Sequence, residues 1–90
     1  MPIKSYIKEI RIMEKDMKKL LELLEGIRPD VDFENETSLI DDGLIESLDI
    51  VAIVTEIMAE FDVEISVDDL LPENFNSAED MLAMIKEKMN

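Results

Sequence analysis

The sequence predicts an all-α fold, a small four-helix bundle with three main helices and a short third helix, and three observations lead to it. Hydrophobic residues make up 47% of the chain but only 4% of residues are aromatic, so aliphatic and methionine side chains must form the core. The chain contains only two glycines and three prolines, so it has few residues that break helices. Apolar residues also recur in steps of three and four, as on one face of a helix. We expect one domain, 1–90, with 1–12 as a candidate N-terminal helical extension.

The first helix is predicted over residues 5–25, because an apolar seam continues through this stretch. Its members alternate in steps of three and four, namely Ile3, Tyr6, Ile10, Met13, Met17, Leu20, Leu24 and Ile27. Gly26 is the expected C-cap, and Pro29 prevents the helix from continuing. Since this helix is longer than a small bundle needs, one hypothesis is that its first turns overhang the bundle. We favour a monomer with the helix along its own bundle; the alternative is self-association or partner contact through the overhang.

A long polar loop, residues 28–46, is predicted between the first and second helices. Loops of this length are often functional. Phe33 and Leu39 are expected to anchor the loop to the core, because they are among the few apolar residues in this polar stretch. No metal site is predicted in it.

The second helix is predicted over residues 48–61 and is apolar almost all the way round. One stripe consists of Val51, Val54, Met58 and Phe61. A second stripe consists of Leu48, Ala52, Thr55 and Ala59. Because a domain this small cannot easily bury a whole helix, the second stripe is a candidate docking surface.

Ser47 stands directly before this helix, and its hydroxyl has two candidate uses. Serine is among the commonest N-caps, so the first interpretation is a cap. The start of a helix also favours negative charge and holds anions, so the second interpretation is a phosphate ester on the hydroxyl. The residues alone leave both open.

The C-terminal third is predicted to contain a short helix and a longer one. Residues 62–65 are expected to form an extended loop. Ser66 and Asp69 indicate a capped helical turn over 67–71, which Pro72 ends, and residues 72–75 are then a loop with Phe75 in the core. The last helix begins at Ser77 with Asp80 in the same pattern. Its apolar stripe and basic C-terminal end consist of Met81, Leu82, Met84, Ile85 and Met89, and of Lys86 and Lys88.

The distribution of charge excludes several classes of function. The formal net charge is −14, and residues 29–85 hold 17 of the 23 acidic residues and no basic residue. Such a surface repels nucleic acid and anionic membranes and favours basic partner surfaces.

The chain has no Cys and no His, which excludes thiol nucleophiles, histidine acid–base chemistry and cysteine zinc sites, so we do not expect an enzyme. Without a membrane-spanning apolar run or a signal-peptide pattern, we expect a cytoplasmic protein with no membrane insertion.

The residues around Ser47 resemble a known family. Residues 43–49 read Gly-Leu-Ile-Glu-Ser-Leu-Asp, and Glu-Phe-Asp-Val-Glu-Ile follows at residues 60–65. Together with the order of helices from about Leu39 to Ile85, this pattern resembles the acyl carrier protein family. In that family, the serine of an Asp-Ser-Leu motif carries a phosphopantetheine arm. Glu46 stands here where the family usually has Asp, which keeps the charge and lengthens the side chain.

The resemblance implies roles for residues and partners. Ser47 is expected to carry 4'-phosphopantetheine, transferred from coenzyme A by a phosphopantetheinyl transferase. Asp42, Glu46 and Asp49 are the expected acidic contacts for that transferase. The stripe of Leu48, Ala52, Thr55 and Ala59 is expected to dock an acyl- or aminoacyl-loading ligase and the downstream acyl-transfer enzymes.

The cargo stays open at this point. The outline is similar to carriers of fatty acid biosynthesis, although Ala52, Met58 and Ala59 take places that are often Glu in them. Residues 69–77, Asp-Leu-Leu-Pro-Glu-Asn-Phe-Asn-Ser, are similar to standalone amino-acid carriers such as D-alanine carrier proteins. The alternative to a carrier is an unmodified acidic helical interaction module that uses the same face or the N-terminal heptads.

Overall fold

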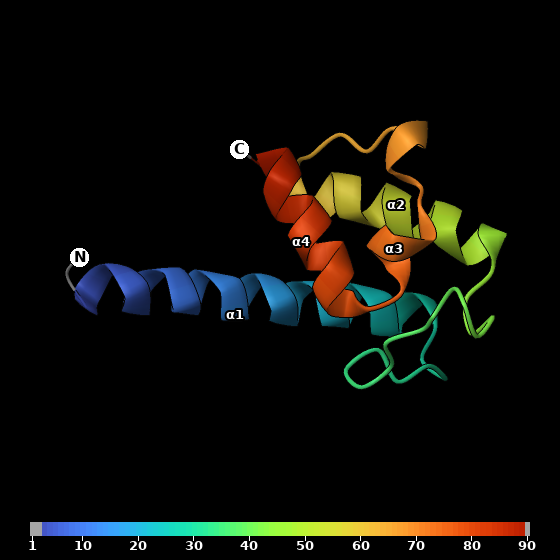
Figure 1. Ribbon diagram of the computed structural model, residues 1–90, viewed down its shortest axis with the longest axis horizontal. Helices are drawn as coiled ribbons and strands as arrows, with labels where there is room; N and C mark the ends of the chain where they lie inside the picture. Colours follow the sequence, from blue (N-terminus) through green and yellow to red (C-terminus); the bar gives the residue numbers. More distant parts are fainter. Residues whose placement is uncertain (1–2, 90) are drawn as a thin grey trace.

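The computed structural model describes the backbone of residues 3–89 and the side chains of residues 13–89. Within this part of the chain the protein is helical and has no strand, which confirms the predicted fold class (Figure 1). In chain order the elements are α1 (Ile3–Ile27), α2 (Ser47–Phe61), the 3₁₀ turn η1 (Val67–Asp69), α3 (Pro72–Phe75) and α4 (Ala78–Met89). None of the described helices is both long and apolar enough to cross a bilayer.

Helix α1 packs on α2 and α4 through its C-terminal half. Leu20 and Leu24 are fully buried, and Met17 lies partly buried against the same core. Met13 is half exposed, and Figure 1 shows the N-terminal half of α1 extending beyond the other helices. The side chains of residues 1–12 lie outside the described residues, so a role for this extension stays a prediction.

The predicted end of α1 needs a correction. The helix continues through Gly26 to Ile27, and the backbone N–H of Arg28 still donates to the carbonyl of Leu24 at 2.9 Å. Gly26 is therefore a residue of the last turn and not a C-cap. Pro29 follows at once and, having no N–H, cannot extend this hydrogen-bond pattern.

The long loop before α2 is fastened to the core as predicted. Phe33 and Leu39 are 2% and 0% exposed. The backbone N–H of Leu39 donates to the carbonyl of Asn76 at 2.9 Å, and the N–H of Ile40 donates to its side-chain oxygen at 3.0 Å. Asn76 lies between α3 and α4, so the end of the loop that leads to α2 is held by the C-terminal third.

The short third helix differs from the prediction. Residues 63–66 form an irregular loop, whereas Asp62, predicted to be extended, is the left-handed C-cap of α2 with φ 53°. The 3₁₀ turn η1 covers only Val67–Asp69, and Pro72 begins α3 instead of ending a helix. Proline fits the first helical position because the N–H that it lacks has no partner there. Phe75, predicted as a core residue in a loop, is buried but belongs to α3.

Helix α4 begins and ends much as the sequence predicts. The N–H of Asp80 donates to the Ser77 hydroxyl at 3.0 Å, which confirms the cap. The predicted apolar stripe is buried except for Met89, which is half exposed at the end of the helix. Lys86 pairs with Asp16 of α1, and Lys88 pairs with Asp69 of η1 at 2.7 Å, which holds the pKa of Asp69 below its ordinary value. The two lysines thus fasten α4 to two other elements.

Candidate functional site

The exposed residue Ser47 is the first residue of α2 and not its cap. Glu46 occupies the N-cap position with extended backbone angles, φ −117° and ψ 176°. Its backbone N–H donates to Oδ2 of Asp49 at 2.9 Å, the return contact of a capping box. The interpretation of Ser47 as a cap is therefore wrong, because Glu46 and Asp49 cap the helix and leave the serine hydroxyl out of this arrangement.

Asp49 is also held from the other side by Arg28, the residue after α1. Nη1 of Arg28 donates to Oδ2 of Asp49 at 2.7 Å. The Nε and Nη2 groups of Arg28 donate to the two carboxylate oxygens of Asp30, each at 2.9 Å. These hydrogen bonds lower the pKa of Asp30 to about 2 and raise the pKa of Arg28. One guanidinium therefore connects the end of α1, the start of the loop and the first turn of α2.

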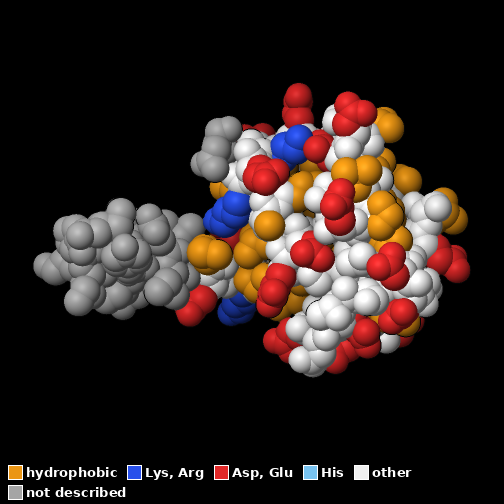
Figure 2. Space-filling view, in the orientation of Figure 1, with side chains coloured by type: hydrophobic (Ala, Val, Ile, Leu, Met, Phe, Trp, Pro, Cys, Tyr) orange, Lys and Arg blue, Asp and Glu red, His pale blue; other side chains and the backbone are white. Residues whose placement is uncertain are grey.

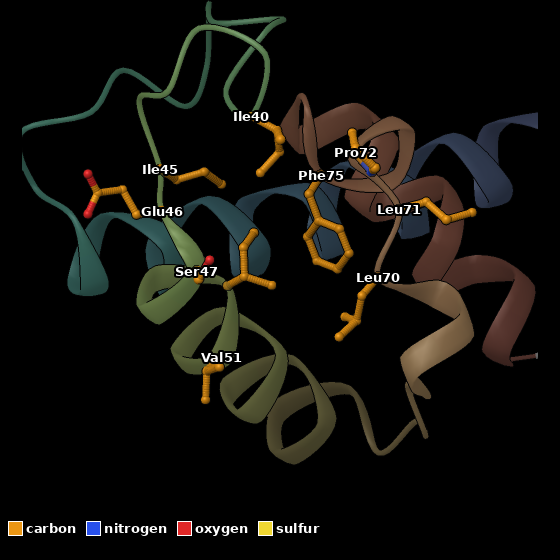
Figure 3. Close-up of a pocket in the computed structure, with 10 residues that line it drawn as sticks. Ile40, Ile45, Glu46, Ser47, Val51, Leu70, Leu71, Pro72 and Phe75 are labelled. Carbon is orange, nitrogen blue, oxygen red and sulfur yellow. The ribbon is translucent and has the colours of Figure 1, made fainter.

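A cleft of about 560 Å³ opens beside Ser47 (Figure 3). Apart from Glu46 and Ser47, every residue that lines it is apolar. The lining comes from three segments, with Ile40 and Ile45 from the loop, Ile50 and Val51 from α2, and Leu70, Leu71, Pro72 and Phe75 from the region of η1 and α3. The cleft can therefore shelter an apolar group that is attached near the start of α2.

The outward side of α2 is a strip of mostly apolar side chains. Leu48 is 85% exposed, Thr55 and Ala59 are exposed, and Ala52 is half-buried. The Thr55 hydroxyl donates to the carbonyl of Val51 at 2.8 Å, so the one hydroxyl of this strip is already hydrogen-bonded. The core side of the helix is formed instead by Ile53, Ile57 and Phe61.

Val51 is the residue that the sequence interpretation placed on the wrong side of α2. It was grouped with Phe61, which is buried, whereas Val51 is 63% exposed and borders both the cleft and the strip. The spacing contained the signal, because Val51 lies three residues after Leu48 and four before Thr55 and so shares their face. Leu70 and Leu71, which complete the far side of the cleft, carried no such local signal.

The three acidic residues predicted near the site differ in their surroundings. Glu46 is exposed beside Ser47, and Asp42 is exposed just before Gly43, which adopts a left-handed conformation with φ 69°. The Asp49 side chain is only 19% exposed, and its carboxylate is engaged by Arg28 and Glu46. Figure 2 shows acidic side chains spread over the bundle, with the few basic ones on the side of α1 and α4.

Comparison with known proteins gives one finding for this region. The family model described as "Phosphopantetheine attachment site" matches residues 15–85. The match spans the helical bundle, including the start of α2 and the cleft, and omits the first part of α1. Searches among curated proteins and among solved structures found no match to this chain.

Proposed function

We propose that Ser47 is the attachment residue of this chain, which belongs to the phosphopantetheine attachment site family of carrier domains that hold a covalent 4'-phosphopantetheine. The observation that carries the proposal is the position of this serine. It is exposed at the first position of a 15-residue helix whose cap is supplied by its neighbours. An enzyme that modifies the chain can therefore reach the hydroxyl without unfolding the helix.

The surroundings of Ser47 fit this group. A phosphate on its oxygen lies at the start of α2, where backbone N–H groups and the helix dipole favour negative charge. The apolar cleft begins at the same residue. When attached, the group supplies a thiol that carries acyl groups as thioesters; the chain itself contains no cysteine.

For the transferase that uses coenzyme A, we propose direct contacts with Asp42 and Glu46. Both are exposed, and residues 29–85 contain no basic residue that would compete for them. Asp49, the third acidic residue predicted for this contact, has its carboxylate engaged within the fold and acts on the site from inside. The surface around Ser47 therefore suits a partner with basic side chains.

In this proposal, the loading ligase and the downstream acyl-transfer enzymes dock on the strip of Leu48, Ala52, Thr55 and Ala59, together with Val51 at its border. These side chains carry no charge, and Leu48 and Val51 present most of their surface to solvent. The contact is therefore mainly apolar, with acidic residues at its edge.

The apolar lining of the cleft favours an acyl group as cargo, as in fatty acid biosynthesis. A second candidate is a D-alanyl or other aminoacyl group, which is supported by the resemblance of residues 69–77 to amino-acid carriers. A charged ammonium group gains nothing from an apolar wall, so the two cargoes differ in what the cleft offers them.

Intact mass tests the assignment of Ser47. Wild-type protein incubated with coenzyme A and a broad-specificity phosphopantetheinyl transferase is expected to gain one arm, and Ser47→Ala none. Because Ser47 is not the cap, the alanine variant should keep its stability within about 0.5 kcal/mol. Ser66→Ala, which alters another exposed serine before a helical turn, serves as the matched control and should load fully. A folded, unmodified wild type that gains no mass would support the interaction module instead.

A further inference from the structure

Arg28 occupies a junction between three segments of the chain. Its backbone closes the last turn of α1, and two of its guanidinium nitrogens hold Asp30 at the start of the loop. The third nitrogen, Nη1, reaches across to Asp49 in the first turn of α2 at 2.7 Å. The side chains of Arg28 and Asp49 are 29% and 19% exposed, so solvent screens this pair less than a fully exposed one.

The Asp49 oxygen that receives Arg28 is also the oxygen that caps α2. Oδ2 accepts the backbone N–H of Glu46 at 2.9 Å, and Glu46 directly precedes Ser47. A continuous series of hydrogen bonds therefore joins α1 to the residue before the proposed attachment site. Charge-assisted hydrogen bonds and forked arginine contacts fix geometry more strictly than neutral contacts do.

This connection acts at a place that the helix cannot stabilise by itself. The first N–H groups of a helix have no partner within it, so the first turn opens easily unless a side chain caps it. Leu48 and Val51, which follow Ser47, are mostly exposed and contribute little burial to that turn. The capping oxygen of Asp49 and the arginine that orients it therefore restrain this turn together with the backbone hydrogen bond from Ile50 to Glu46 at 3.0 Å.

We propose that Arg28 is a positioning residue for the modification of Ser47, and that it acts through Asp49. Without touching the reacting hydroxyl, it keeps the first turn of α2 closed in the one conformation that the transferase binds. This inference rests on the proposed attachment at Ser47. When the turn is closed for only part of the time, the apparent Kd equals the intrinsic Kd divided by the closed fraction. Loss of Arg28 should therefore raise the KM for the carrier and leave kcat unchanged.

The test compares Arg28→Gln with wild type in two measurements. In transferase kinetics with saturating coenzyme A, we expect the KM for the carrier to rise roughly three- to tenfold at unchanged kcat. Amide hydrogen exchange at residues 46–50 should accelerate by at least this factor, because exchange follows the open fraction, while exchange near Phe61 stays as in wild type. Arg28→Lys, which keeps the charge but loses the fork, should restore part of the KM.

Lys19→Gln is the matched control. Lys19 of α1 donates to the carbonyl of Glu60 at 2.6 Å. This variant therefore removes a basic contact to the C-terminal end of α2, opposite to the end that Arg28 contacts. Its KM should equal that of wild type. An equal rise in both glutamine variants would show a general loss of stability and overturn the inference, as would wild-type KM and wild-type exchange in Arg28→Gln.

Asp49→Asn decides the matter if Arg28→Gln does not fold. The asparagine oxygen can still accept the N–H of Glu46, but Arg28 loses its charged partner. A raised KM with faster exchange at residues 46–50 supports the inference, and wild-type values overturn it. If wild type itself does not load on Ser47, the proposed function fails, whereas the exchange data still report whether Arg28 closes the turn.

Discussion

The two ends of α2 are both held by a basic residue from the region of α1, but in different ways. At the C-terminal end, Phe61 is 7% exposed, and the ammonium group of Lys19 lies 4.9 Å from the centre of its ring. At the N-terminal end, Arg28 acts on Asp49, while Ser47 and Leu48 remain exposed. Burial therefore fixes one end, and polar contacts fix the other.

This difference shows how a small domain can keep a helix firm and its first turn accessible. Burial restrains a residue by covering it, and a covered serine cannot meet an enzyme. Hydrogen bonds to the backbone and to Asp49 restrain the first turn while they leave the Ser47 hydroxyl and the neighbouring strip uncovered. The site is thus separated from the core along a single helix.

The largest effect is expected at the buried end. Phe61→Ala removes a core ring and should lower the free energy of unfolding by about 3–5 kcal/mol, measured by urea denaturation. A domain of this size has only about 5–15 kcal/mol in total. Molecules that remain folded should still load on Ser47, because the first turn keeps its own restraints. A loss below about 1 kcal/mol would contradict the contrast between the two ends.

At the exposed end, Leu48→Ser with Val51→Ser should change function more than stability. Both side chains are mostly solvent-exposed, so the free energy of unfolding should stay within about 1 kcal/mol. Because these side chains become buried when the loading ligase docks, kcat/KM for the ligase with the carrier as substrate should fall by roughly tenfold or more. Val67→Ser, which alters a valine that is 83% exposed on η1, is the matched control and should react like wild type.

Acid titration addresses the polar network itself. The hydrogen bonds from Arg28 lower the pKa of Asp30 to about 2 from its ordinary 3.8. A lowered pKa stabilises the folded state above pH 4, and this contribution is lost as the pH falls from 3.8 toward 2. Wild type should therefore exceed Asp30→Asn in urea midpoint at pH 6, and the difference should shrink across this window. If the difference in urea midpoint stays constant over this pH range, the ionised carboxylate of Asp30 does not stabilise the fold through Arg28.

The smallest effect is expected from salt. Added NaCl screens the Arg28–Asp49 pair at one end of α2 and leaves the burial of Phe61 unchanged, but it also screens the repulsion that comes with a net charge of −14. Because acidic residues outnumber basic ones by 23 to 9, relief of repulsion should prevail and raise the Tm by a few degrees. A lowered Tm would show that the ion pairs outweigh the repulsion, and an unchanged Tm would show that the two balance; either result contradicts the prediction.

Local pattern was enough to predict much of the fold. Helical periodicity identified α1, α2 and α4, and isolated apolar residues identified the anchors Phe33 and Phe75. The error at Val51 overlooked a local spacing signal, whereas the error at the cap of α2 concerns a contact with a distant partner. Whether Ser47 or Glu46 caps α2 depends on an Asp49 that Arg28 holds from 21 positions earlier, and this contact leaves no local trace in the sequence.

The candidate site could be predicted only in part, because some of its residues come together only in the folded protein. The resemblance around residues 43–49 indicated Ser47, and helical spacing placed Leu48 and Thr55 on one face. The cleft was not predictable, because Leu70 and Leu71 meet Val51 only after the chain has folded. Its apolar lining is a property of the tertiary structure and not of any one segment.

The uneven charge also governs what happens when two copies of this protein collide. Residues 29–85 contain 17 acidic residues and no basic one, so two copies that approach through their α2 faces repel each other. At physiological ionic strength, this repulsion reaches about 8 Å and therefore acts before the apolar strips touch. An enzyme with a basic surface meets attraction over the same range. In a crowded solution, the same negative charge therefore disfavours self-association of this protein and favours its association with basic partner surfaces.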